Sequence, residues 1–272
     1  MLINPYVYAP TTASEFIFTV DTTQAGSATD TFVLPLHNGT TSMTVYWGDG
    51  NSDVITTYNQ AELSHTYASS GTYQISLDGS FYGIRFGGGG DCRKVMTIDN
   101  WGTNQWVTMQ SAFQLCLNVT GNYSDNPDTS LCLNFSTSFR DCQAFNSALT
   151  LDASVCTTMN TMFFGAISFN SPLTISNASN INDTINAFAY CYPFDQDISA
   201  IDFSGLTSGT NMLKNTAFST TNYDLLLPAW DAYGTSGVVF HAGTAQYSSG
   251  APATARANMI SRGWTITDGG AV

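Results

Sequence analysis

The sequence predicts a multidomain protein in which an all-β sandwich is followed by an α/β solenoid. Three observations carry this prediction: short alternating strands near the N-terminus, an apolar motif that returns about every 25 residues, and a helix–strand pattern at the end. The expected boundaries are an extended arm at 1–14, the sandwich at 15–84, the solenoid at 85–248 and a helix–strand cap at 249–272.

Composition narrows the classes of function. Of 272 residues, 43% are apolar, which suffices for a large core, and only 10% are charged. The net charge of −13 repels phosphate backbones, so nucleic-acid binding is not expected. The chain has no apolar run long enough for a membrane span, and its first residues do not resemble a secretory signal peptide.

The first 14 residues contain two prolines and no periodicity, which predicts an extended arm. One interpretation is a free chain end. The other is an aromatic anchor, in which Tyr6 and Tyr8 dock on a partner subunit.

The next 70 residues predict antiparallel strands. Phe16–Val20, Thr44–Trp47 and Thr72–Leu77 are rich in β-branched and aromatic residues, and Gly48-Asp49-Gly50 is a hairpin signal. Short strands at this spacing are typical of a β-sandwich.

One set of residues in this segment carries a resemblance. Trp47-Gly48-Asp49-Gly50, followed by His65-x-Tyr67 and Gly71-x-Tyr73, resembles the polycystic kidney disease (PKD) domain, an immunoglobulin-like sandwich of surface proteins. The resemblance implies that Trp47 fills the core, Asp49 fixes the turn and His65 is a structural histidine. It also implies a spacer or docking role.

The repeated motif is Phe-x-x-Cys/Ala-x-x-Phe. Its leading residues are Phe113, Phe139, Phe163 and Phe188, with a degraded copy at Met212. The first half of each repeat, such as Met159–Ala166, predicts a short helix or 3₁₀ turn. The second half, such as Leu149–Asp152 or Leu173–Ser176, predicts one strand of a parallel sheet, as in leucine-rich repeats.

The segment Met159-Asn160-Thr161-Met162-Phe163-Phe164-Gly165-Ala166, continued to Leu173, resembles the BspA-type leucine-rich repeat, the DUF285 family. The resemblance implies an adhesion or protein-binding protein of the kind found on bacterial surfaces and among tailed-phage structural proteins. It brings no catalytic residues.

Two columns of the repeat indicate structural roles. Cys116, Cys142 and Cys191 share a position with Ala166, which favours buried thiols over disulfides as the role of the six cysteines. Asn146, Asn170 and Asp195 share another position. They are expected to bind the backbone of neighbouring repeats, with a metal site as the weaker alternative.

The last 50 residues predict strands at Tyr223–Pro228 and Val238–Phe240. They also predict a helix that begins near Pro252 and ends before Gly263, and a final strand at Trp264–Asp268.

The outward face of the predicted strands is the candidate binding site; a plain solvated surface is the alternative. Its residues are Tyr123, Thr150, Asp152, Thr174, Ser176, Ser199 and Asp202. No histidine lies at metal-ligand spacing from a cysteine pair or a glutamate, so no metal, cofactor or catalytic residue is predicted. The carboxylate pair Asp195 and Asp197 leaves a glycan-degrading enzyme as a minor hypothesis.

These observations predict a non-enzymatic virion protein of a tailed phage, either a capsid decoration or a tail or fibre component, made in the host cytoplasm. It would bind other virion subunits through the arm or the PKD-like domain, and a host-surface protein or glycan through the repeats. The alternative is a bacterial cell-surface adhesin. A homo-oligomer is left open.

Overall fold

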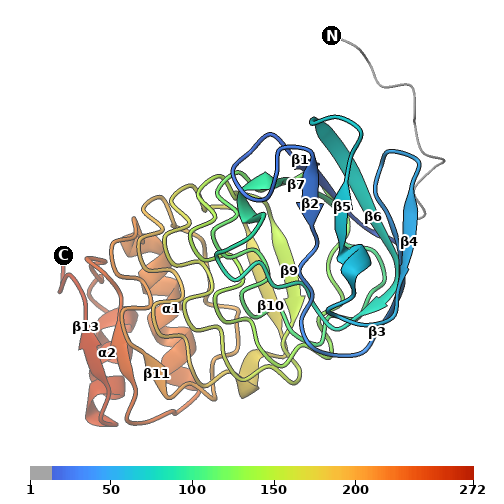
Figure 1. Cartoon of the computed structure of the whole chain (residues 1–272). Helices are drawn as coiled ribbons and strands as arrows, with labels where there is room; N and C mark the ends of the chain where they lie inside the picture. The colour runs from blue at the N-terminus through green and yellow to red at the C-terminus, as the bar shows by residue number, and fades with distance from the viewer. Residues whose placement is uncertain (1–13) are drawn as a thin grey trace.

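The computed structural model describes residues 14–272, in which an N-terminal sheet is continued by a stack of repeats (Figure 1). The sheet has six strands in the order β4-β3-β6-β1-β7-β8. Their bounds are β1 Phe16–Asp21, β3 Thr41–Tyr46, β4 Ser52–Ile55, β6 Thr72–Phe81, β7 Val95–Asn100 and β8 Thr120–Gly121. The anchor residues Tyr6 and Tyr8 lie outside the described residues.

The expected immunoglobulin/PKD-like sandwich is wrong. Nearly all strand pairing occurs in the one large sheet, because the ten-residue β6 pairs with both β1 and β3, and β1 also pairs with β7. Opposite it, β2 (Thr31–Val33) and β5 (Ser64–Thr66) form only a two-stranded sheet of three residues each. A second full sheet is therefore not formed.

The local roles expected around Trp47 are nevertheless confirmed. Trp47 is fully buried, and its ring stacks on His65 with centroids 4.8 Å apart. His65 Nε2 lies 2.9 Å from Asp49 Oδ2, and Asp49 Oδ1 accepts from the Asn51 N–H at 3.0 Å. Hydrogen bonds from His65 and Asn51 outweigh burial and lower the pKa of Asp49. His65 is thus a structural histidine.

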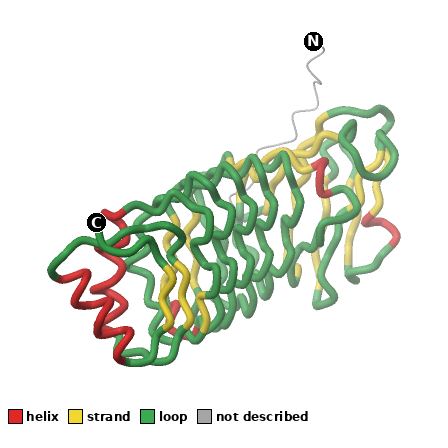
Figure 2. Tube along the Cα trace, turned by 90° about the vertical axis from the view of Figure 1, so that its left-hand side faces the viewer, coloured by secondary structure: helices red, strands yellow, loops and turns green. Residues whose placement is uncertain are grey.

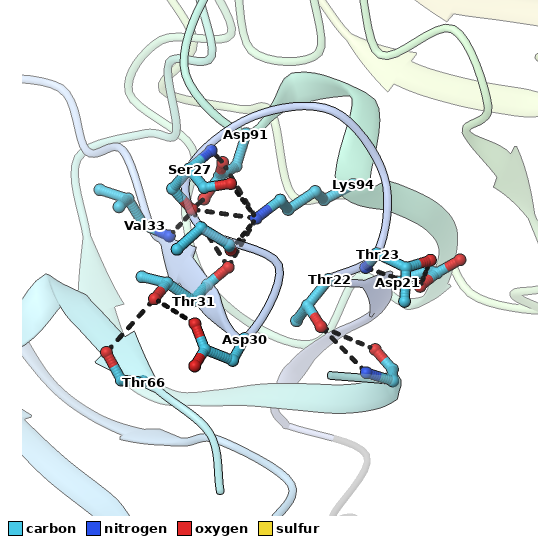
Figure 3. Close-up of polar contacts among 12 residues, drawn as sticks. Asp21, Thr22, Thr23, Ser27, Asp30, Thr31, Val33, Thr66, Asp91 and Lys94 are labelled. Carbon is cyan, nitrogen blue, oxygen red and sulfur yellow. Dashed lines mark hydrogen bonds and ion pairs between the residues drawn. The ribbon is translucent and has the colours of Figure 1, made fainter. Parts of the chain in front are cut away.

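A buried ion pair holds the loop before β2 against the sheet, as Figure 3 shows. Lys94, in the 3₁₀ turn η2 (Cys92–Lys94), donates to the carbonyl oxygens of Ala28 at 2.9 Å and Thr31 at 2.7 Å. Its Nζ lies 3.5 Å from Asp91, whose carboxylate accepts from Ser27. Both charged side chains are fully buried, so each depends on the other.

Beyond the sheet, each repeat forms one irregular turn of chain, here called a coil, and the coils of residues 106–218 form the repeat stack. Figure 2 shows them lying side by side. Alternate N–H groups of one coil donate to carbonyl groups of the next. The bonds of the leading phenylalanines, each 2.8 or 2.9 Å long, run Phe113 to Ser138, Phe139 to Met162, Phe163 to Ala187 and Phe188 to Met212.

The phenylalanines of successive coils form one interior row. The centroids of the Phe139 and Phe163 rings are 5.5 Å apart, and those of Phe163 and Phe188 are 5.6 Å apart, with nearly parallel planes. All three side chains are fully buried. The row follows from the motif spacing, because each coil cannot cover its own apolar side.

The expected leucine-rich-repeat solenoid is nevertheless wrong, and the described chain is a mixed α/β structure with several small sheets. The segment Met159–Ala166 is not helical, because Thr161 (φ 57°) and Gly165 (φ 69°) are left-handed and interrupt any helix after four residues. Within the repeat stack, the only paired strands of more than two residues are β9 (Leu149–Asp152) and β10 (Leu173–Ser176). Elsewhere the described coils are joined by single bridges and by hydrogen bonds between turns, and no continuous parallel sheet closes the expected solenoid.

The two structural columns predicted for the repeat are confirmed. Asn146 Oδ1 accepts from the N–H of Asn170, and Asn170 Oδ1 accepts from the N–H of Asp195, both at 2.8 Å. All six cysteines are buried and unpaired. Burial raises the pKa of Cys156 to about 11 and that of Cys132 to about 12.

The C-terminal region differs from prediction in one element. Tyr223–Pro228, expected as a strand, lies in helix α1 (Thr220–Ala232), which begins after Ser219; the Ser219 side chain accepts from the Asn222 N–H. Helix α2 (Ala251–Ser261) forms where predicted and packs against α1. A parallel sheet completes the region, with strands β11 Ser208–Gly209, β12 Val239–His241 and β13 Thr265–Thr267.

Candidate binding surface

The strands β9 and β10 bring four of the predicted site residues together. They pair in parallel and in register, with Thr150 opposite Thr174 and Asp152 opposite Ser176. Side chains alternate between the two faces of each strand. Leu149 and Leu151 of β9 and Leu173 and Ile175 of β10 are buried, and Thr150 and Thr174 are exposed. The result is a small polar face on a buried apolar support.

Asp152 already has partners within the chain. Its Oδ1 accepts from the Ser154 N–H at 2.8 Å and from the Asn177 side chain at 3.1 Å. Hydrogen bonds from the side chains of Ser154 and Asn177 lower the pKa of Asp152, so the carboxylate is ionised at neutral pH. Because Asn177 follows β10, Asp152 also ties the two coils together.

The other three predicted residues lie outside this pair of strands. Tyr123 is half-buried against Trp101, with ring centroids 5.5 Å apart, and its hydroxyl donates to the Ala148 carbonyl at 2.9 Å. Burial raises the pKa of Tyr123. Ser199 and Asp202 are half-buried in turns of the coil after β10. The Ser199 N–H donates to Asp197, and Asp202 Oδ1 accepts from the Ser204 N–H.

The face that remains open to a partner therefore centres on Thr150 and Thr174. No hydrogen bond from either hydroxyl is present within residues 14–272. Ser176 is exposed beside them, although its hydroxyl reaches the Leu151 carbonyl at 3.2 Å. Side chains of this kind offer neutral hydrogen-bond donors and acceptors, with no group suited to proton transfer or nucleophilic attack.

Sequence reasoning missed three exposed apolar residues next to the cysteine column. Leu131, Leu133 and Val155 are 46%, 51% and 39% exposed. Leu131 and Leu133 flank the buried Cys132, and Val155 precedes the buried Cys156, so the signal was an apolar residue adjacent to each of these two cysteines.

Two further observations concern metal binding and membrane crossing. Within the described residues, no group of three or more His, Cys, Asp or Glu side chains is placed to hold a metal ion. Neither α1 nor α2 is long and apolar enough to cross a bilayer, and no other α-helix occurs in residues 14–272.

The stacked coils define a repeat protein with an interior row of buried, stacked phenylalanines. Comparison with protein families specifies the repeat: residues 93–146 and 107–225 match the family described as Mycoplasma protein of unknown function, DUF285. The two matches together span residues 93–225, which include the whole repeat stack. No curated protein and no solved structure matches the chain.

Proposed function

We propose that this chain is a non-enzymatic surface protein of a tailed-phage particle that binds a host-surface molecule through the face of β9 and β10. One observation carries the proposal: Thr150 and Thr174 stand opposite each other, exposed, on strands whose other faces are buried. A polar face held this rigidly loses little conformational entropy on binding, which favours recognition.

The N-terminal sheet has a separate role in this proposal. We propose that the six-stranded sheet joins the chain to neighbouring virion subunits. The repeat stack then extends away from the attachment point, since the C-terminus lies at the end of the molecule opposite the sheet (Figure 1). A bacterial cell-surface adhesin would use the same two regions in the same way.

The binding face is tested with the double variant Thr150→Glu/Thr174→Glu and labelled full-length chain on host cells. Two carboxylates on the face would repel a partner fitted to hydroxyls, and we expect binding at least about tenfold weaker, or about 1.4 kcal/mol. The matched control is Thr157→Glu, an exposed threonine outside β9 and β10. Equal binding by the double variant and the control would contradict the proposed face.

Mass spectrometry of purified phage particles and of host cell-wall fractions tests whether the chain belongs to the virion or to the bacterial cell surface. The chain is expected in the particles. Its presence in the cell wall alone would decide for the adhesin. Release of products from a panel of host glycans would instead show a glycan-degrading enzyme.

A further inference from the structure

A cleft of about 400 Å³ lies where the N-terminal sheet meets the first coil. One wall comes from the end of β6 and the residue after it, and the other from the chain between β7 and the second coil. The lining residues used here are Ser80, Phe81, Tyr82, Asn104, Gln105 and Leu131. Its volume is within the roughly 300–1,000 Å³ that is common for small-molecule sites.

The two walls are held together by hydrogen bonds. The Phe81 N–H donates to Asn104 Oδ1 at 3.0 Å, and the Val107 N–H donates to the Tyr82 carbonyl at 3.1 Å. Phe81 also packs edge-on against the fully buried Trp106, with centroids 5.1 Å apart. The cleft is therefore formed before any ligand arrives.

Unsatisfied polar groups gather at this junction. Asn104 is 6% exposed, and its Nδ2 has no hydrogen-bond partner among the described residues. The same holds for Thr41 Oγ1, opposite Phe81 in the sheet, and for Trp106 Nε1. All three atoms are covered by the protein, so a ligand in the cleft cannot reach them; the accessible polar side chains of the lining include those of Ser80 and Gln105.

The lining determines the chemistry of the ligand. None of the residues lining the cleft is charged, so neither an anion nor a cation would find a counter-charge there. The polar groups are hydroxyls, amides and backbone groups, and the apolar side includes Leu131, which is 46% exposed. A saccharide ring presents this same combination, with an apolar face of C–H groups and an edge of hydroxyls.

We propose that the cleft binds a neutral saccharide unit. The apolar face of the sugar packs on Leu131 and Tyr82. Gln105 and Ser80, both exposed in the lining, supply the hydrogen bonds at the rim. This site is separate from the face of β9 and β10 and does not depend on the function proposed for that face.

The test is titration of the full chain with cellobiose, maltose, lactose and N,N′-diacetylchitobiose, followed by calorimetry and by amide chemical shifts. Galacturonic acid disaccharide is the charged comparison. We expect at least one neutral disaccharide to bind and to shift the amides of Asn104 and Gln105, and the uronate to bind at least about tenfold more weakly. Failure of all four neutral probes, or tighter binding of the uronate, would overturn the proposal.

Variants then locate the site. Gln105→Ala removes the amide at the rim, and Leu131→Ala removes the apolar contact; each should weaken binding about tenfold or more. Leu225→Ala, at an exposed leucine of α1, is the control and should not change affinity. Ser80→Trp, at an exposed lining residue, should block the cleft.

Saccharide binding that persists in Ser80→Trp and Leu131→Ala would show that the site lies elsewhere and overturn the assignment. Thr150→Glu/Thr174→Glu should bind the disaccharide normally. Failure of this proposal and failure of the β9–β10 face can therefore be told apart.

Discussion

In the N-terminal sheet, backbone groups are paired by strands that lie far apart in the sequence, as when Phe18 of β1 pairs with Ile75 of β6 and Ile98 of β7. In the repeat stack, the same groups are paired between equivalent residues one coil apart, with few residues in regular strands. The comparison shows that a chain made mostly of turns becomes rigid when each turn lies against a copy of itself. Propagation from coil to coil replaces regular secondary structure.

The largest effect is expected from Phe163→Ala in the middle of the phenylalanine row. The ring stacks on Phe139, Phe169 and Phe188, so its removal leaves a cavity shared by three coils. We expect a loss of about 3–5 kcal/mol in the free energy of unfolding, measured by urea denaturation. Phe164→Ala, one residue away and half-buried, should cost clearly less. Equal losses would show that the row does not hold the stack together.

On the sheet side, Lys94→Met should cost about 3 kcal/mol, because Asp91 would be left as a buried carboxylate without a counter-charge. The double variant Lys94→Met/Asp91→Asn removes both charges and should recover part of this loss. Thermal and urea unfolding of the three proteins measure the difference. A single variant as stable as the parent would show that the pair contributes nothing to the sheet.

Alkaline pH should affect the repeat stack more than the sheet, because five of the six buried thiols follow residue 100. Burial raises the pKa of Cys156 from 9.0 to about 11 and that of Cys132 to about 12. The folded state therefore holds protons that the unfolded state releases. The resulting stabilisation is complete below pH 9 and is lost as pH rises through 11 and 12.

Urea midpoints measured between pH 8 and 10 test this slope before most tyrosines ionise. The double variant Cys132→Ala/Cys156→Ala should show a shallower decline than the parent. Identical slopes would contradict the assignment of buried thiols as the cause.

The smallest effect is expected from Thr161→Gly, for which a left-handed backbone and a helix predict changes of opposite sign in the free energy of unfolding. A left-handed threonine is strained, so Thr161→Gly should leave stability unchanged or raise it by up to about 1 kcal/mol. In a helix, the same substitution would lower stability by up to about 1 kcal/mol. The urea midpoint distinguishes the two.

The sequence predicted the apolar rows of the stack well and its backbone poorly. Phe139, Phe163 and Phe188 recur at a fixed interval, and burial follows directly from that interval. One of the left-handed positions of the repeat is occupied by Thr161 in one coil and by Asn186 in the next, and a threonine gives no sequence signal for a positive φ. Apolar residues spaced as in a helix therefore gave a wrong prediction of helices.

The candidate sites likewise include one that the sequence predicts and one that it does not. Thr150 and Thr174 were identifiable because strand alternation was intact on both sides of them. The cleft was not, because it brings together Ser80, Asn104 and Leu131 from three separate stretches of chain. The buried Lys94 was also unpredictable, since its partners include backbone carbonyls of a loop more than 60 residues earlier.

Hydrogen exchange tests the central claim about the repeat stack most directly. If the coils are rigid because they bond to one another, the N–H groups of Phe139, Phe163 and Phe188 should exchange as slowly as those of β1 and β6, although they lie in turns. Exchange of these three amides at the rate of an exposed loop, with β1 and β6 still protected, would contradict the account.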